Sequence, residues 1–220
     1  MSFCKDKVAV VTGAGGTLCG PIAADLAKQG AKVVLIGRTA SKLESTAAAI
    51  AQFDGVCRIE TGSVTDEAAM QAIADRVAAE WGPCRFLING AGGNQPAALT
   101  TRLQFDPAEL TGPMAGGEKG WWDVDLDVFE SVLLTNTMGT VIPSRVFAKQ
   151  MAAAGGGAII NFGSMNTYRP LTRVAAYAMS KAAIANWTQF LAQYLAPAKI
   201  RVNAIAPGFF VNDRSRKILC

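Results

Sequence analysis

The chain has 220 residues, of which half are hydrophobic and 17% are charged, and its formal net charge is +4. This composition is that of a globular domain large enough to bury a core, and it excludes a disordered or fibrous chain. The basic residues are spread along the sequence rather than clustered, so we expect no nucleic-acid partner. No apolar run is long enough to span a bilayer, so we expect no membrane partner either.

The N-terminus leads directly into a short apolar strand, without the long apolar region or the cleavage site of a secretory signal. The five cysteines show no paired spacing, and the chain contains no histidine. Neither a disulfide framework nor a metal site is therefore expected. These features are typical of a cytoplasmic protein.

Short β-branched runs alternate with longer Ala- and Leu-rich segments, which predicts repeated strand-helix units and a parallel sheet. The expected strands are Val8–Val11, Lys32–Ile36, Val56–Glu60, Phe86–Asn89, Ala158–Phe162 and Arg201–Ile205. The expected helices are Gly20–Gln29, Ala40–Phe53, Asp66–Trp81, Val124–Ala153 and Ala175–Leu195. Right-handed crossovers make this an α/β fold with a doubly wound parallel sheet in the order 3-2-1-4-5-6.

Residues 94–120 form an unusually long connection between the fourth strand and the next helix, with several prolines and glycines. The connection follows the carboxyl end of a central strand, where open α/β sheets bind their ligands. We therefore expect this insertion to contribute one wall of a substrate pocket. A floppy surface insertion is the alternative.

A glycine-rich turn, Thr12-Gly-Ala-Gly-Gly-Thr17, follows the first strand and precedes a helix. Such a turn lets backbone N–H groups approach a pyrophosphate at the N-terminus of a helix. We expect a dinucleotide to bind here, and an ordinary tight turn without a ligand is the alternative. The expected contacts are Gly13, Gly15, Thr17 and Leu18.

The second strand ends in Leu35-Ile-Gly-Arg38. This segment lacks the acidic residue that would bind a ribose 2′-hydroxyl, and it offers an arginine instead. The exchange favours NADP over NAD as the cofactor. Arg38 as a solvated surface cation is the alternative.

Tyr177 and Lys181 are four residues apart in an expected helix, and Ser164 lies shortly upstream. Positions i and i+4 of a helix project from the same face, so the phenol and the ammonium group can share one site and the cation can stabilise the phenolate. A tyrosine in this position can donate or accept a proton. The pattern therefore indicates a hydride-transfer enzyme.

Taken together, the motifs resemble the short-chain dehydrogenase/reductase family, and they span almost the whole chain in the family's order. They are Thr12-Gly13, Asn89-Gly-Ala-Gly92, Asn136, Ser164, Tyr177-Ala-Met-Ser-Lys181 and Pro207-Gly208. The resemblance implies a Rossmann-type fold in which residues 1–220 form a single dinucleotide-binding and catalytic domain. It also implies an NAD(P)-dependent enzyme that interconverts a ketone and a secondary alcohol by hydride transfer.

The resemblance further assigns roles to individual residues. Tyr177 would be the catalytic acid/base, and Lys181 would support it and hold the nicotinamide ribose. Ser164 would orient the substrate oxygen, and Asn136 would maintain a proton-relay water. Purely structural roles are the alternative for each. Other implied cofactor contacts are Ser63, Val64, Asn89, Gly90, Ala91, Tyr177, Lys181, Pro207 and Gly208.

Several positions depart from the family pattern. Thr17 and Cys19 stand where the phosphate turn usually has its second and third glycines. Ser63 replaces an acidic residue that commonly meets the adenine, and Asn212 replaces a threonine that often binds the carboxamide. A catalytically weak dinucleotide sensor or scaffold protein is therefore an alternative to an enzyme.

A closer resemblance connects Ile88–Asn94, the insertion and Gly163–Arg173 with the D-mannonate oxidoreductase (fructuronate reductase) branch of the family. This implies a small, anionic sugar-acid substrate. A carbonyl reductase for another sugar, polyol or acyl ketone is the alternative. Arg173 is expected to pair with a substrate carboxylate, or else to cap a loop as a structural arginine. The expected substrate contacts are Asn94, Met165, Asn166 and Arg173.

The family normally continues beyond Pro207-Gly208 through a mobile substrate-covering segment and one more strand. Residues 209–216 would begin that segment, and we expect that the C-terminal strand is missing because the sequence omits residues. The apolar faces of the two longest helices suggest a homodimer or homotetramer. Packing of those faces onto their own sheet alone is the alternative.

Overall fold

The computed structural model describes residues 2–112 and 114–210. Its strands are β1 (Val8–Thr12), β2 (Lys32–Gly37), β3 (Cys57–Thr61), β4 (Cys84–Asn89), β5 (Gly157–Phe162) and β6 (Ile200–Ile205). Its α-helices are α1 (Cys19–Lys28), α2 (Ala40–Ala51), α3 (Glu67–Trp81), α4 (Leu126–Ala153) and α5 (Ala175–Leu195). The six strands are parallel in the order β3-β2-β1-β4-β5-β6, so the predicted doubly wound sheet is confirmed.

The boundaries of the elements differ from expectation by at most two residues. Helix α4 begins at Leu126 rather than at Val124, because the side chain of Asp125 accepts a hydrogen bond from the backbone N–H of Val128. Strand β4 begins at Cys84, two residues before the expected start. Caps and strand pairing, rather than apolar periodicity, set these ends.

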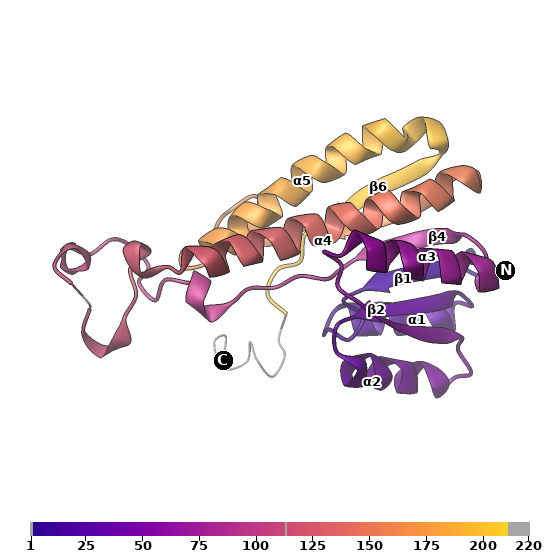
Figure 1. The fold of residues 1–220 in the computed structure, drawn as a ribbon, viewed down its shortest axis with the longest axis horizontal. Helices are drawn as coiled ribbons and strands as arrows, with labels where there is room; N and C mark the ends of the chain where they lie inside the picture. Colours follow the sequence, from indigo (N-terminus) through magenta and orange to yellow (C-terminus); the bar gives the residue numbers. More distant parts are fainter. Residues whose placement is uncertain (1, 113, 211–220) are drawn as a thin grey trace.

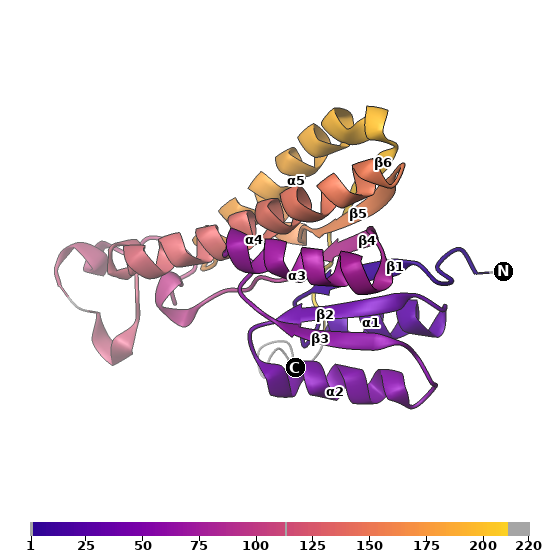
Figure 2. The ribbon, with the colours of Figure 1, turned by 45° about the vertical axis from the view of Figure 1, so that its right-hand side comes forward.

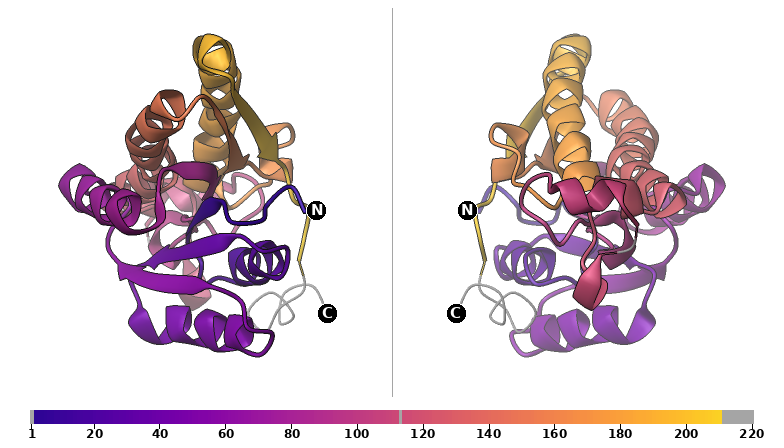
Figure 3. Two further views of the ribbon diagram at one scale, coloured as in Figure 1. Left: turned by 90° about the vertical axis from the view of Figure 1, so that its right-hand side faces the viewer. Right: turned by 90° about the vertical axis from the view of Figure 1, so that its left-hand side faces the viewer.

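The helices cover the two faces of the sheet as two groups (Figure 3). Helices α1 and α2 pack on one face through a cluster that includes Ala23 and Leu43. Helices α3, α4 and α5 pack on the other face, with Ile73, Phe147 and Leu191 in the core. Strand β1 is buried along its whole length, as expected for a central strand of a parallel sheet.

Polar side chains lie in register near the carboxyl ends of three adjacent strands. Thr12 pairs with Asn89 across β1 and β4, and Asn89 pairs with Asn161 across β4 and β5. The Asn89 amide donates to Asn161 Oδ1 and to Ser144 Oγ, both at 2.9 Å. Asn161 Nδ2 donates in turn to Thr188 Oγ1 at 2.9 Å, so a buried polar ladder joins both strands to α4 and α5.

The insertion and the N-terminal part of α4 extend away from the sheet, as Figures 1 and 2 show. Helix α4 has 28 residues and is therefore roughly 40 Å long, much longer than the strands that it covers. Its first turns lie beside the insertion, where the side chain of Gln95 donates to Ser131 Oγ at 2.9 Å. The insertion is thus joined to the body of the protein through α4.

Among the helices of residues 2–112 and 114–210, none combines the length and the apolar character needed to cross a membrane. Cys4, Cys19, Cys57 and Cys84 are free thiols.

The buried ladder predicts the effect of replacing Thr188 with valine. The substitution keeps the shape of the side chain but removes the acceptor for Asn161 Nδ2, which leaves a buried donor unpaired. We expect the free energy of unfolding to fall by about 1–3 kcal/mol. Urea denaturation measures it, with the exposed Thr111→Val as control. Equal, small losses in both variants would show that the ladder contributes nothing.

Candidate active site

A cleft runs along the carboxyl edge of the sheet and contains two cavities that share several glycines. The first, here called the outer lobe, has a volume of about 570 Å³ and is lined by residues such as Arg38, Ser63 and Ala91. The second, the inner lobe, has a volume of about 300 Å³. Gly13, Gly16, Gly90, Gly92 and Gly93 line both lobes.

The glycine-rich turn after β1 packs tightly against the loop after β4. Gly13 has φ +67°, and a Cβ at this position would lie 2.9 Å from backbone atoms of Gly90 and Ala91. The Thr12 hydroxyl accepts hydrogen bonds from the backbone N–H groups of those same two residues, at 3.1 and 3.2 Å. Thr12 and Gly13 therefore fix the distance between the two loops that form the floor of the cleft.

Cys19 fills the place where the family pattern has its third glycine. Its side chain is buried and packs directly over Gly90, where an added Cβ would overlap the sulfur. Burial raises the pKa of the Cys19 thiol to about 11, against an opposing effect of Lys181. The thiol is therefore neutral at physiological pH and acts as a packing group between α1 and β4.

The first turn of α1 borders the inner lobe. Thr17, Leu18 and Cys19 line this lobe, and no side chain caps the helix N-terminus. Uncapped N–H groups at a helix N-terminus are suited to bind an anionic phosphate. The close glycine packing and this helix end fit a dinucleotide, even though Thr17 and Cys19 depart from the usual glycines.

Among the described residues, cations and no carboxylates line the outer lobe. Arg38 and Lys42 both border it, together with Thr39, Ser63 and Thr65. Arg38 is exposed directly after β2, and Lys42 lies in the first turn of α2. This charge pattern suits a ligand that carries negative charge on this side of the cleft.

The inner lobe brings together Ser164, Tyr177 and Lys181, as the sequence predicted. Ser164 follows β5, whereas Tyr177 and Lys181 lie on the first turns of α5. The ammonium nitrogen of Lys181 is 5.5 Å from the centroid of the Tyr177 ring. The i, i+4 spacing therefore places the two groups in one cavity, as expected.

Lys181 is only 6% exposed, and its ammonium group donates a hydrogen bond of 2.7 Å to the backbone carbonyl of Phe162. Burial lowers the pKa of Lys181 to about 8. A thiolate at Cys19 would oppose this shift, but the Cys19 thiol keeps its proton well above neutral pH. The cation is thus held at a substantial desolvation cost beside the tyrosine.

Two neighbours hold Ser164 in position. Its backbone N–H donates to Thr167 Oγ1 at 3.1 Å, and the Thr167 hydroxyl donates to the carbonyl of Lys181 at 3.1 Å. Thr167 therefore ties the loop after β5 to α5. The hydroxyl oxygen of Ser164 accepts hydrogen bonds from the backbone N–H and the side-chain amide of Asn166.

Asn136 is fully buried in α4, and its amide forms two hydrogen bonds with the backbone of Gly93. Asn136 Oδ1 accepts from the Gly93 N–H at 2.8 Å, and Nδ2 donates to the Gly93 carbonyl at 2.9 Å. The side chain therefore holds the loop after β4 in place. Its predicted role with a proton-relay water stays a prediction.

A third cavity, the insertion cavity, has a volume of about 820 Å³ and lies between the insertion and the start of α5. Phe105, Trp121 and Trp122 line it from the insertion side. Asn166 and Arg173 border it from the loop between β5 and α5. The cavity is mostly apolar, and it reaches the residues next to Ser164.

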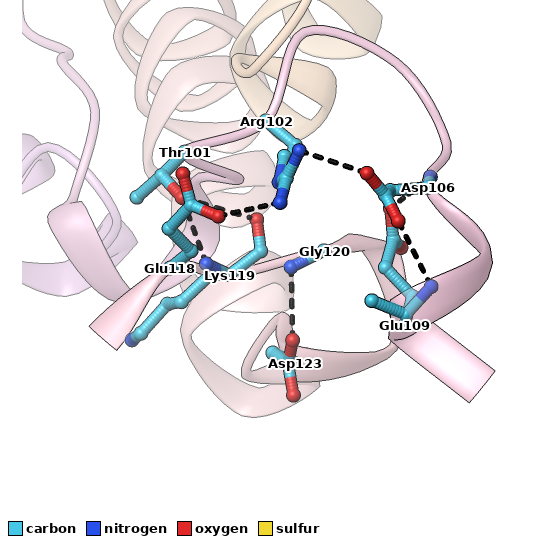
Figure 4. Close-up of polar contacts among 9 residues, drawn as sticks. Thr101, Arg102, Asp106, Glu109, Glu118, Lys119, Gly120 and Asp123 are labelled. Atoms are coloured by element: carbon cyan, nitrogen blue, oxygen red, sulfur yellow. Dashed lines mark hydrogen bonds and ion pairs between the residues drawn. The ribbon is translucent and has the colours of Figure 1, made fainter. Parts of the chain in front are cut away.

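The insertion has a defined structure that polar contacts between its own residues maintain (Figure 4). Arg102 pairs with Asp106 at 3.0 Å and with Glu118 at 2.7 Å, so one guanidinium group joins two segments. Glu109 accepts hydrogen bonds from the backbone N–H groups of Asp106 and Trp121. These contacts hold the backbone of Trp121 beside the cavity. The expected part of the insertion in a substrate pocket stays a prediction.

Arg173 is exposed and has a left-handed backbone conformation, with φ +73°. Its backbone carbonyl accepts a hydrogen bond from the N–H of Thr100 at 3.3 Å, which links this loop to the insertion. Of the charged groups around the insertion cavity, Arg102 and Glu109 are engaged within the insertion. Arg173 forms no ion pair with the described residues.

The structure places the other predicted residues as follows. Gly15, Ser63, Val64, Ala91 and Asn94 line the outer lobe, and Pro207 and Gly208 line the inner lobe. The side chains of Asn89 and Met165 line none of the three cavities, and that of Asn89 lies in the buried ladder. Asn212 and residues 211–216 of the expected substrate-covering segment lie outside the described residues.

Sequence reasoning did not single out two residues that shape the cleft. Thr167 joins Ser164 to Lys181 through hydrogen bonds, and Lys42 adds a second cation to the outer lobe. A lysine four residues after Arg38, in the first turn of the next helix, is a signal that could have been used. Thr167 carries no comparable local signal.

Comparison with known proteins gives a consistent result. The sequence profile of the short chain dehydrogenase family matches residues 7–219. An uncharacterized oxidoreductase of Bacillus subtilis, UxuB, is 37% identical over 97% of this chain and 74% of its own length. The D-threitol dehydrogenase of Mycolicibacterium smegmatis is 32% identical over 96% of this chain and 73% of its own length.

Two solved structures are also similar. A provisionally named D-mannonate oxidoreductase from Haemophilus influenzae, with bound NAD, has a TM-score of 0.90 and 36% identity over 98% of this chain and 75% of its own. An NAD⁺-bound xylitol dehydrogenase has a TM-score of 0.83 and 30% identity over 98% of this chain and 76% of its own. The chain therefore belongs to the short-chain dehydrogenase family. It is an NAD(P)-dependent oxidoreductase of that family.

The buried Lys181 predicts a pH-dependent stability. Between pH 8 and 10.5 the unfolded chain binds a proton at Lys181 that the folded protein has lost, so the free energy of unfolding rises with pH in this window. Below pH 8 both states are charged, and this contribution has no slope. We expect the free energy of unfolding of the native protein, relative to that of Lys181→Met, to rise by up to about 1.4 kcal/mol per pH unit.

Urea denaturation of the ligand-free proteins, repeated at pH values from 8 to 10.5, measures this difference in the free energy of unfolding. The exposed Lys149→Met is the matched control on α4. A difference that stays flat from pH 8 to 10.5 would show that Lys181 is not desolvated.

Proposed function

We propose that this enzyme interconverts a ketone and a secondary alcohol with Ser164, Tyr177 and Lys181 as its catalytic groups. The single observation that supports this most strongly is that these three side chains line one small cavity continuous with the glycine-lined cleft. A hydroxyl donor, a phenol and a buried cation are the groups that proton transfer at a substrate oxygen requires.

The proposed reaction gives each residue a distinct part. A bound nicotinamide dinucleotide supplies the two-electron redox chemistry. In the oxidative direction, the Tyr177 phenolate accepts the hydroxyl proton of the substrate while the adjacent carbon loses hydride. In reduction, the phenol returns that proton to the carbonyl oxygen. Lys181 stabilises the phenolate electrostatically, and Ser164 donates a hydrogen bond to the reacting oxygen.

NADP is the proposed preferred cofactor, with NAD as a second substrate of the same cleft. The support is the pair of cations, Arg38 and Lys42, at an outer lobe that no carboxylate of residues 2–112 and 114–210 lines. A 2′-phosphate on the adenosine ribose would pair with such cations. The Haemophilus influenzae relative has bound NAD, which favours NAD as the cofactor. The rates with NADPH and with NADH therefore need to be measured side by side.

A sugar acid such as D-mannonate or D-fructuronate is the proposed substrate. The similarity to the Haemophilus influenzae protein supports this class, as does Arg173, a cation at the insertion cavity without an ion pair among the described residues. Carbohydrate rings and chains pack well against aromatic side chains such as Trp121 and Trp122. A neutral polyol is the second candidate, because D-threitol and xylitol dehydrogenases are also similar to this chain.

We also propose a homodimer or homotetramer in the cytoplasm. Exposed apolar side chains on α4 and α5, among them Leu134, Phe190 and Tyr194, supply surface that a second subunit would bury. The four free thiols agree with a reducing compartment.

The absorbance of NADPH and of NADH, followed with fructuronate, other keto acids and neutral ketoses, tests the activity, the substrate class and the cofactor. We expect selective oxidation of NADPH with fructuronate. Tyr177→Phe should lower kcat at least about 1,000-fold while the dinucleotide Kd stays unchanged, because only the proton-transfer group is lost. Full activity of this variant would exclude Tyr177 as the acid/base.

Arg173→Ala tests recognition of the carboxylate. A charge-assisted pair contributes about 1.5–3 kcal/mol, so we expect kcat/KM for an acid substrate to fall about 10- to 100-fold. The kcat/KM for the neutral analogue should change little. Arg169→Ala is the matched control, because Arg169 is also an exposed arginine in the loop between β5 and α5. An unchanged ratio of acid to neutral substrate would exclude a carboxylate contact at Arg173.

A further inference from the structure

Asn166 lies two residues after Ser164, in the short 3-10 helix η5 (Met165–Thr167). Its side chain is only 6% exposed. The amide nitrogen Nδ2 donates to Ser164 Oγ at 3.3 Å, and the backbone N–H of Asn166 donates to the same oxygen at 3.2 Å. The amide oxygen accepts a hydrogen bond from the N–H of Leu171 at 2.8 Å.

The contact with Leu171 determines which way the amide of Asn166 points. A backbone N–H can only donate, so the group facing Leu171 must be the amide oxygen. The NH₂ group then necessarily faces Ser164. The orientation is thus a consequence of the hydrogen-bond network, because the opposite orientation would place two donors against each other.

A serine hydroxyl has two lone pairs and one proton. In this structure, two N–H groups of Asn166 donate to Ser164 Oγ, which equals the number of hydrogen bonds that its two lone pairs can accept. Only the hydroxyl proton stays available, and the inner lobe is where Ser164 meets Tyr177 and Lys181. We propose that Asn166 is a positioning residue that makes the Ser164 hydroxyl a hydrogen-bond donor only, directed at the reacting oxygen of the substrate.

This inference rests on the proposed function, and it gives Ser164 a defined effect on the reaction. Negative charge grows on the substrate oxygen as its proton is transferred, so a fixed donor becomes more favourable toward the transition state. A hydroxyl free to accept would instead bind the neutral alcohol and stabilise the ground state. Because Asn166 fills the acceptor positions of Ser164, the hydroxyl can only donate its hydrogen bond, and it donates to the reacting oxygen.

Asn166→Asp is the sharpest test, because it preserves the size of the side chain and the acceptor for Leu171. An ionised carboxylate cannot donate to Ser164 Oγ and would instead accept its proton, which reverses the polarity of the contact. We expect kcat to fall about 10- to 100-fold, with the dinucleotide Kd unchanged. The ratio of variant to native kcat should rise as the pH is lowered from about 8 to about 5, because a protonated carboxyl can donate again.

A double-mutant cycle separates this positioning role from a general structural one. In a Ser164→Ala background, Asn166→Asp should cause no further loss of kcat, because the hydroxyl on which it acts is absent. Equal fold losses in both backgrounds, or a kcat ratio that does not vary with pH, would overturn the inference.

Nuclear magnetic resonance provides a readout that does not depend on turnover. The side-chain amide signal of Asn166, assigned by its loss in Asn166→Asp, should shift in Ser164→Ala and stay in place in the exposed control Ser41→Ala. An amide signal that has the same chemical shift in Ser164→Ala as in the native protein would overturn the inference, whether or not any substrate reacts. A shifted signal without turnover on any carbonyl would support the contact and contradict the proposed function instead.

Discussion

The register of the parallel sheet is the constraint on which the rest of this structure depends. It aligns Thr12, Asn89 and Asn161, so that three adjacent strands carry polar side chains at the same level near their carboxyl ends. These side chains then hold the loops and helices that follow: Thr12 holds the turn at Gly90, and Asn161 holds α5 through Thr188. Because α5 also carries Tyr177 and Lys181, the buried polar ladder connects the core of the sheet to the proposed chemistry. A slip of one residue would turn each of these side chains to the other face of the sheet.

The inner lobe combines groups whose requirements conflict. Lys181 loses hydration on burial, which lowers its pKa, yet the proposed reaction uses its positive charge. The Phe162 carbonyl offsets part of that cost by accepting a hydrogen bond from the ammonium group. Cys19, a bulkier residue than the usual glycine, is accommodated because Gly90 opposite it has no side chain. In both cases a neighbouring residue of the fold makes room for, or stabilises, a group that would otherwise be unfavourable at this place.

Much of the fold and the core of the site could be predicted from the sequence. The strand order follows from alternating apolar segments and right-handed crossovers, and the i, i+4 spacing of Tyr177 and Lys181 fixes their common face. Contacts between distant segments could not be predicted, because they depend on packing rather than on a local pattern. Thr167, whose hydroxyl bridges Ser164 and Lys181, has no distinguishing neighbours in the sequence. The side chain of Asn89 lies in the buried ladder, and the expected contact of this residue with the cofactor stays a prediction.

The insertion has a further consequence for how such an enzyme can change. The polar contacts that shape its tip, through Arg102 and Glu109, join residues of the insertion to one another rather than to the sheet. New side chains at Phe105 or Trp122 would therefore reshape the insertion cavity without disturbing the proposed dinucleotide cleft or the proposed catalytic groups. Under the proposed function, changes confined to this segment would alter the choice of substrate while the proposed catalytic groups stay the same, which gives evolution a way to vary one without the other.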